Sequence, residues 1–230
     1  MAFVNQRNIS DMGLREKGGI TYKYYTAAKP TFGFGHGLSY TTFTFEHVHN
    51  TSGLSGPTRK HVVSASALAA DDRRFYANRR ASDTAATAAS SSVYAVKVTN
   101  TGAVASAVVV LGFVNATHPD APPKAELFDF ARVAMLLPGA SQTVSLAMNP
   151  SVLAVVDKRG VSSIVPSTYD VLFGVEGAAE GMVASTQLVV TGDRPVVLFS
   201  MPNARQQHRD TMAQTYGAHA ELHDDFNMFS

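Results

Sequence analysis

The run Val93-Tyr94-Ala95-Val96-Lys97-Val98-Thr99-Asn100 carries the clearest structural pattern in the chain. Side chains alternate between the two faces of an extended segment, so its large apolar residues, Tyr94, Val96 and Val98, share one face. Lys97 and Thr99 fall on the other face. The Thr101-Gly102 pair that follows is a turn signal. The pattern predicts a strand that is buried on one side and ends in a tight turn.

Other stretches on both sides of this run also have strand character, and turn signals such as Pro138-Gly139 and Asp157–Gly160 separate them. Short strands at this spacing are typical of a two-sheet sandwich. We therefore expect an all-β sandwich of about seven strands over residues 41–192. Besides Val93–Asn100, the expected strands are Thr41–Val48, His61–Leu68, Ala105–Val114, Ala131–Leu137, Gln142–Met148, Thr168–Val175 and Thr186–Thr191.

Three regions fall outside this strand pattern. Residues 69–92 are rich in Ala, Ser, Asp and Arg. Because this composition buries little apolar area, we expect an exposed, partly disordered insertion there. Residues 1–31 hold no long periodic segment and could not form a core alone, so we expect them to lie against another body, either a missing part of a larger polypeptide or the domain that follows. Residues 193–230 form a C-terminal extension, in which Val196–Phe199 could add an edge strand after Pro195.

The stretch Phe32-Gly33-Phe34-Gly35-His36-Gly37-Leu38-Ser39-Tyr40-Thr41-Thr42-Phe43 alternates glycines with aromatic and imidazole groups. Glycine adopts backbone angles that are closed to other residues, and it lets another chain approach closely. A phosphate-binding loop would need a following helix and a Lys-Ser/Thr pair, whereas a strand pattern follows here. We therefore expect an irregular segment pressed against another surface, with no nucleotide bound.

Composition excludes several classes of function. Lys and Arg number 19 against 18 Asp and Glu, a net charge of +1, so charge gives no reason to expect nucleic acid or an anionic membrane as partner. No apolar run is long enough to span a bilayer, and Met1–Ser10 lacks the apolar core of a secretory signal. The absence of cysteine excludes disulfides and thiolate chemistry. Sequons for N-glycosylation occur at Asn8, Asn50 and Asn115.

Several motifs follow one another in an order that is informative as a set. They are Phe34–Tyr40, Val98–Gly102, Val108–Val114, Leu127–Val133, Leu137–Ser141 and Tyr169–Gly174. The first resembles the end of the second catalytic domain of glycoside hydrolase family 3 enzymes, and the others resemble, in register, the fibronectin type III-like domain that follows it. The order of Asp11, Thr21–Tyr25 and Phe34–Tyr40 looks most like the β-xylosidase branch. Phe128-Asp129 departs from the family, which usually has Lys-Gly there.

This resemblance implies a domain organisation and a function. Residues 1–40 would be a remnant of the preceding α/β domain with an interdomain linker, and residues 41–192 a fibronectin type III-like (immunoglobulin-like) β-sandwich with an insertion near 69–92. This non-catalytic module would dock on the catalytic domains of a retaining β-xylosidase or β-glucosidase, or stabilise them. Those domains would belong to the same polypeptide. We also expect Phe130 to be buried in the sandwich. The residues expected at the docking surface are Phe34, Gly35, His36, Gly37, Leu38, Ser39, Tyr40 and Phe43.

Catalytic side chains and cofactors are not expected in this chain. In the family that it resembles, both catalytic carboxyl groups lie upstream of the matched region, and no segment here matches the nucleophile motif. Glu16, Glu126 and Glu176 are therefore expected to be solvated structural residues. His47 and His49 share one strand face but lack a firm third ligand for a metal. As part of a full enzyme, the chain would be secreted or lumenal.

A stand-alone carbohydrate-binding or adhesion β-sandwich is the alternative function. The chain contains no tryptophan, which argues against an aromatic platform for sugar rings, although tyrosines could substitute. Retardation of the chain on xylan or β-glucan would distinguish this alternative from a docking module.

Overall fold

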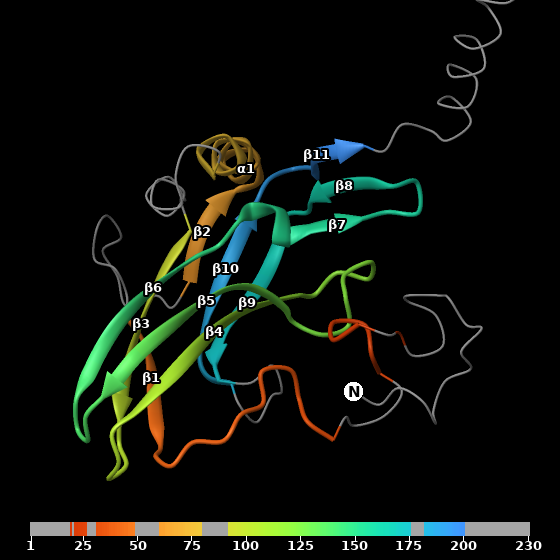
Figure 1. Cartoon of the computed structure of the whole chain (residues 1–230). Coiled ribbons are helices and arrows are strands. Elements are labelled where there is room, and N and C mark those ends of the chain that lie inside the picture. Colours follow the sequence, from red (N-terminus) through yellow and green to blue (C-terminus); the bar gives the residue numbers. More distant parts are fainter. Residues whose placement is uncertain are drawn as a thin grey trace, which may run out of the picture.

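The computed structural model describes residues 19, 21–26, 31–48, 60–79, 92–175 and 182–200, and strands dominate this part of the chain (Figure 1). One α-helix, α1 (Ala65–Arg79), and one short 3-10 helix, η1 (Pro150–Leu153), accompany them. The strands are β1 (Phe43–Val48), β2 (Lys60–Ser64), β3 (Val93–Asn100), β4 (Ser106–Ala116), β5 (Glu126–Leu136), β6 (Ser141–Ala147), β7 (Ala154–Val156), β8 (Val161–Ile164), β9 (Ser167–Gly174), β10 (Met182–Thr191) and β11 (Val196–Ser200).

The strands form three sheets, and two of them face each other as a sandwich. One sheet of the sandwich has the order β1-β3-β6 and the other has the order β2-β10-β9-β4-β5, while a third sheet of short strands has the order β11-β8-β7. Neighbouring strands are antiparallel except β10 and β2, which are parallel. The alternation expected for Val93–Asn100 is present in β3, whose residues are alternately half-buried and buried. The predicted all-β sandwich is confirmed, as is the edge strand expected after Pro195, which is β11.

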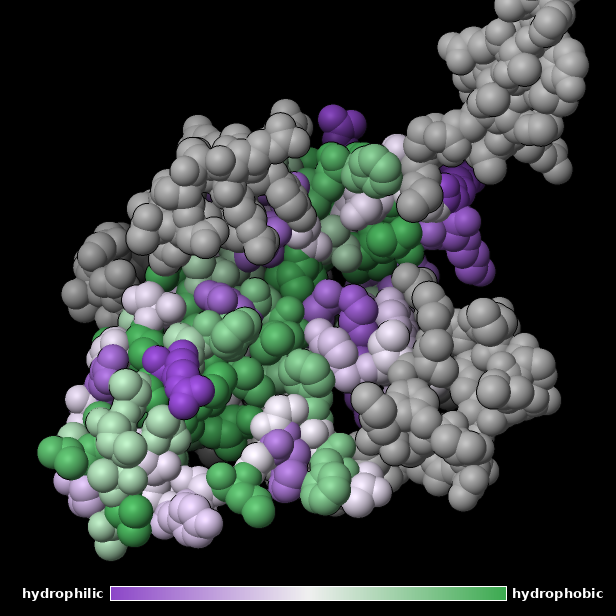
Figure 2. All heavy atoms as spheres, viewed as in Figure 1, coloured by the Kyte–Doolittle hydropathy of each residue, from purple (hydrophilic) through white to green (hydrophobic). Residues whose placement is uncertain are grey.

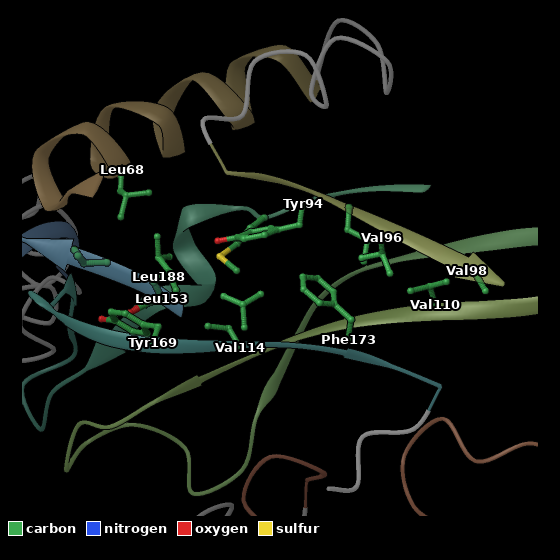
Figure 3. Close-up of a cluster of buried hydrophobic side chains, with 14 of the residues drawn as sticks. Leu68, Tyr94, Val96, Val98, Val110, Val114, Leu153, Tyr169, Phe173 and Leu188 are labelled. Atoms are coloured by element: carbon green, nitrogen blue, oxygen red, sulfur yellow. The ribbon is translucent and has the colours of Figure 1, made fainter. Parts of the chain in front are cut away.

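The core lies between the two sheets of the sandwich. Figure 3 shows side chains from β3, β4 and β9 meeting there, among them Val96, Val110 and Phe173, each 0% exposed. Tyr169, at the start of β9, is also buried and donates its hydroxyl to the carbonyl oxygen of Val165, with an oxygen–oxygen distance of 2.8 Å. Burial raises the pKa of Tyr169 to about 12. This hydrogen bond holds the turn before β9 against the core.

Helix α1 corrects the expectation of an exposed insertion beginning at residue 69. Strand β2 ends at Ser64, and the Ser64 hydroxyl accepts a hydrogen bond from the amide of Ala67 at 3.2 Å, so this serine caps the helix. Leu68 and Ala69 are then 0% and 2% exposed. Leu68 points from the helix toward the end of the sandwich, beside Leu188 (Figure 3). The prediction of a strand over His61–Leu68 is therefore wrong beyond Ser64, where the strand ends and α1 begins.

The expectation that Phe130 is buried is also wrong, since this side chain is 64% exposed. The cause is a bulge in β5: Gly112 pairs with Asp129, but Phe113 pairs with Leu127, which leaves Phe128 as the extra residue. Phe128 turns inward, where its ring lies edge-on to that of Phe173 with centroids 6.4 Å apart. In a regular strand Phe128 and Phe130 would share one face, so the bulge places them on opposite faces, Phe128 toward the core and Phe130 toward solvent.

Candidate docking surface

The described N-terminal residues lie on the outer face of the five-stranded sheet. Val108, Val110 and Val114 of β4 belong to the core, so the alternate residues Leu111 and Phe113 point to the opposite face. The Tyr22 ring stacks on the Phe34 ring, with centroids 4.5 Å apart. The Phe34 ring in turn meets the Phe113 ring edge-on, with centroids 6.1 Å apart. Phe113 is 0% exposed as a result, although it lies outside the sandwich core.

Polar contacts fix the same N-terminal segment to the start of β5. Lys23 Nζ lies 2.7 Å from Glu126 Oε1 in an ion pair. The Leu127 amide donates to the Tyr22 hydroxyl oxygen at 3.0 Å, and the Lys124 amide donates to the Lys23 carbonyl oxygen at 3.1 Å. Residues 21–26 therefore pack on the sandwich itself, one of the two bodies against which an incomplete segment could lie.

We call residues 31–42, which run from this face to β1, the seam. The end of the seam is held by Asn100, which is 0% exposed. The Thr41 hydroxyl donates to Asn100 Oδ1 at 2.7 Å. Asn100 Nδ2 donates to the carbonyl oxygens of Val104 and Leu136, both at 2.8 Å. One buried amide thus ties the seam to two turns of the sandwich.

Close backbone contact completes this attachment. The Thr101 amide donates to the Thr42 carbonyl oxygen at 2.9 Å. A Cβ atom on Gly102 would lie within 2.9 Å of the Thr42 amide nitrogen and closer still to the Thr41 hydroxyl, so only glycine leaves room for the seam to pass here. The turn predicted from Thr101-Gly102 is therefore also the point at which the seam joins the sandwich.

Between its two attached ends, the seam presents apolar side chains to solvent. Leu38 and Tyr40 are 96% and 94% exposed. Phe32 is 61% exposed, and its ring stacks on that of His36 with centroids 4.9 Å apart. A Cβ atom on Gly37 would meet nothing within 4 Å. The seam as a whole is therefore a ridge of exposed aromatic and aliphatic groups.

The residues expected at the docking surface divide into two groups. Phe34 packs on the outer face of the sheet, and Phe43 packs against the core at the start of β1. The remaining expected residues lie along the exposed part of the seam. They are Gly35, His36, Gly37, Leu38, Ser39 and Tyr40.

Sequence reasoning missed an apolar area beside the seam. On the outer face of β4, Val109 is 38% exposed and Leu111 is 8% exposed, and Phe130 of β5 pairs directly with Leu111. Figure 2 shows apolar atoms reaching the surface over the region of β4 and β5. The signal was present in Val108–Val114, which is apolar on both strand faces.

Among the described residues, other candidate sites have structural roles. Glu126 is paired with Lys23, and the ring of His47 stacks on that of Phe173 with centroids 5.6 Å apart. No group of three potential metal-ligating side chains occurs in this part of the chain, and no helix there is long and apolar enough to cross a membrane. Asn115 lies half-buried in β4. Glu16, Glu176, His49, Asn8 and Asn50 lie outside the described residues.

Comparison with known proteins agrees with this architecture. Residues 108–176 match the family described as the fibronectin type III-like domain. Over 210 residues the chain is 31% identical to a probable exo-1,4-beta-xylosidase of Aspergillus fumigatus, and over 203 residues it is 29% identical to one of Aspergillus terreus. These alignments cover 89% and 86% of this chain but 24% and 23% of the relatives. The chain therefore spans about a quarter of the length of these relatives.

Solved structures with a similar fold also belong to glycosidases that are much longer than this chain. A GH3 exo-beta-xylosidase solved with a xylobiose aziridine probe superposes with a TM-score of 0.63 at 25% identity, over 84% of this chain and 23% of that one. A beta-glucosidase from Kluyveromyces marxianus shares the fold, with a TM-score of 0.54 at 21% identity over 76% of this chain and 17% of that one. The fold and the matches define a fibronectin type III-like β-sandwich. The predicted family resemblance is confirmed, and it is to the C-terminal region of glycoside hydrolase family 3 enzymes.

Proposed function

We propose that this chain is the non-catalytic C-terminal module of a retaining β-glycosidase, and that it docks on and stabilises the catalytic domains through the seam. The observation that carries the proposal is the exposure of Leu38 and Tyr40, at 96% and 94%, between two ends that are fixed to the sandwich. Large apolar side chains presented together on an ordered ridge are typical of an interaction surface. Burying both would contribute about 3–6 kcal/mol to the contact.

The names of the relatives support a proposal for the reaction of the whole enzyme. The sequence relatives are named as probable exo-1,4-beta-xylosidases, and a solved structure of the same fold is named as a beta-glucosidase, so we propose hydrolysis of β-xylosides or β-glucosides as the activity of the whole enzyme, working in a secretory lumen or outside the cell. Retaining hydrolysis needs two carboxyl groups about 5 Å apart. We place both of them in the catalytic domains, because Glu126 is committed to Lys23 and the family carries its catalytic pair upstream of this region.

Two assays on the chain alone test the non-catalytic role. The purified chain should not hydrolyse aryl β-xylosides or aryl β-glucosides, and hydrolysis that survives purification would contradict the proposal. Affinity electrophoresis on xylan and β-glucan should show no retardation. Retardation that Tyr40→Ala abolishes would instead support a carbohydrate-binding module, because Tyr40 is the most exposed aromatic residue of the seam.

A chimera tests docking directly. In the probable exo-1,4-beta-xylosidase of Aspergillus fumigatus, the matched quarter would be replaced by this whole chain. The double substitution Leu38→Ser/Tyr40→Ser should lower the melting temperature of the chimera by at least about 3 °C and leave that of the isolated chain unchanged. Val62→Ser is the matched control, because Val62 is 57% exposed on β2, away from the seam. Equal shifts in the chimera and the isolated chain would contradict docking through the seam.

A further inference from the structure

The outer face of strand β4 is apolar where the outer face of a two-sheet sandwich is ordinarily solvated. Val109, Leu111 and Phe113 lie on that face, opposite the core residues Val108 and Val110. A strand that is apolar on both faces is typical of one covered on both sides. The sequence of β4 therefore indicates that a second layer lies over this part of the sheet.

The described residues supply only part of that layer. The stacked rings of Tyr22 and Phe34 cover Phe113 completely. Leu111, next to Phe113 on this face, is still only 8% exposed, but beyond it the cover is incomplete, because Val109 is 38% exposed and Phe130 is 64% exposed. We call Val109, Leu111 and Phe130 the outer-face patch.

The patch is continuous with the covered part of this face. Leu111 pairs with Phe130 across β4 and β5, so the two side chains are neighbours on one face. Leu111 is also two residues from Phe113, which places both on that same face. The patch therefore adjoins the area where Phe34 already packs.

We propose that the outer-face patch is the second part of the docking surface and that it is covered by the catalytic domains in cis, so that Phe130 is buried between the sandwich and that body. This inference rests on the proposed function and names the face of the sandwich that meets the partner.

Two features of the chain favour this occupant. Residues 21–26 and the seam both run along the side of the sandwich that carries the patch, with Phe34 as their common contact. A body joined to the sandwich through these segments is held beside the patch at high effective concentration. In addition, about three quarters of the length of the relatives lies outside the region that this chain matches, since the chain covers 24% of the relative from Aspergillus fumigatus.

The exposed side chain of Arg132 indicates which kind of residue the partner surface should carry at the edge of the patch. Arg132 pairs with Val109 across β4 and β5, so it lies at the border of the patch. The partner surface should therefore be apolar at its centre, with an acidic side chain opposite Arg132 at its edge.

The test compares two phenylalanines of similar exposure. Phe130→Ser changes the patch, and Phe199→Ser is the matched control, because Phe199 is 56% exposed on β11 in a different sheet. Each substitution would be made in the isolated chain and in the xylosidase chimera. We expect Phe130→Ser to lower the melting temperature of the chimera by at least about 3 °C and to change that of the isolated chain by less than about 1 °C. Phe199→Ser should have no effect in either protein.

A second substitution, on a different strand, controls for the possibility that serine at position 130 destabilises β5 itself. Val109→Thr keeps the branched shape but replaces one methyl group by a hydroxyl on β4, so it should also destabilise the chimera alone. Equal effects of Phe130→Ser in both proteins would overturn the proposal. A dimer of the isolated chain in sedimentation that Phe130→Ser dissociates would overturn it as well, because a second copy would then cover the patch.

The same chimera separates failure of this inference from failure of the proposed function. If Leu38→Ser/Tyr40→Ser destabilises the chimera but Phe130→Ser does not, docking through the seam stands and the outer-face patch is not part of it. If neither change affects the chimera, both proposals fail.

Discussion

Substitution of Asn100 by alanine tests how the seam is held. The Asn100 side chain makes four hydrogen bonds: it donates to the carbonyl oxygens of Val104 and Leu136, and it accepts from the Thr41 hydroxyl and the Gly102 amide. It is 0% exposed, so water cannot replace these partners in the folded state without rearrangement.

The magnitude follows from the groups left unpaired. A buried polar group that loses its partner costs about 1–3 kcal/mol, and Asn100→Ala orphans two carbonyl acceptors and two donors. The two donors lie near the surface, where water can reach them in part. We therefore expect Asn100→Ala to lower the free energy of unfolding by about 3–5 kcal/mol.

Urea unfolding of the isolated chain measures this loss. Asn149→Ala is the matched control, because the Asn149 side chain accepts a hydrogen bond from the Ser151 amide at the start of η1, at 3.1 Å, and its loss should cost about 1 kcal/mol. Asn100→Asp keeps the shape but turns both donors into acceptors that face carbonyl oxygens, so it should be at least as harmful at neutral pH and recover partly on acidification. A loss below about 1 kcal/mol for Asn100→Ala would refute this account of the seam's attachment.

Three further substitutions test the core. Tyr94 is 2% exposed and its hydroxyl has no hydrogen-bond partner among the described residues, so Tyr94→Phe should leave the free energy of unfolding unchanged or raise it by up to about 1 kcal/mol; a loss of stability would show a hidden partner. Burial lowers the pKa of His61 below its usual 6.5. The unfolded chain then takes up a proton first as pH falls, so stability should decrease below about pH 6.5, and His61→Gln should flatten that decrease in pH-dependent melting. In Gly112→Ala, the new Cβ would lie 2.5 Å from the Phe128 ring, and urea unfolding should show a loss of about 1–3 kcal/mol; no loss would mean that the ring moves freely.

Local sequence patterns predicted the regular strands well. The run Val93–Asn100 became β3 with the expected bounds, because alternation and a following turn define both its face and its end. The short β7 and β8 were missed, although the Asp157–Gly160 turn between them was recognised. Strands of three or four residues carry too little alternation to be distinguished from loops.

Features that depend on tertiary pairing could not be predicted in the same way. The face of Phe130 followed from a bulge at Phe128, and a bulge shifts the register without an unambiguous signal in its own strand. Helix α1 was missed because its charged and alanine-rich sequence lacks a clear apolar stripe, and the burial of Leu68 depends on the end of the sandwich beneath it.

The docking surface was predictable in part. The aromatic and glycine residues of the seam could be named from their spacing, but their exposure depends on how Thr41 is fixed to Asn100. The outer-face patch was visible as the apolar run Val108–Val114, which was interpreted only as a strand. A run that is apolar on both faces also predicts a covering layer.

The central claim is that the seam is covered by the catalytic domains. Hydrogen exchange of the seam amides, compared between the isolated chain and the xylosidase chimera, tests it most directly. Leu38 and Tyr40 are almost fully exposed in this chain, so their amides should exchange rapidly there and at least about tenfold more slowly in the chimera, as expected when a surface becomes buried. The β3 amides, which are paired on both sides, should be protected in both proteins. Equally rapid exchange of the seam amides in both would contradict the claim.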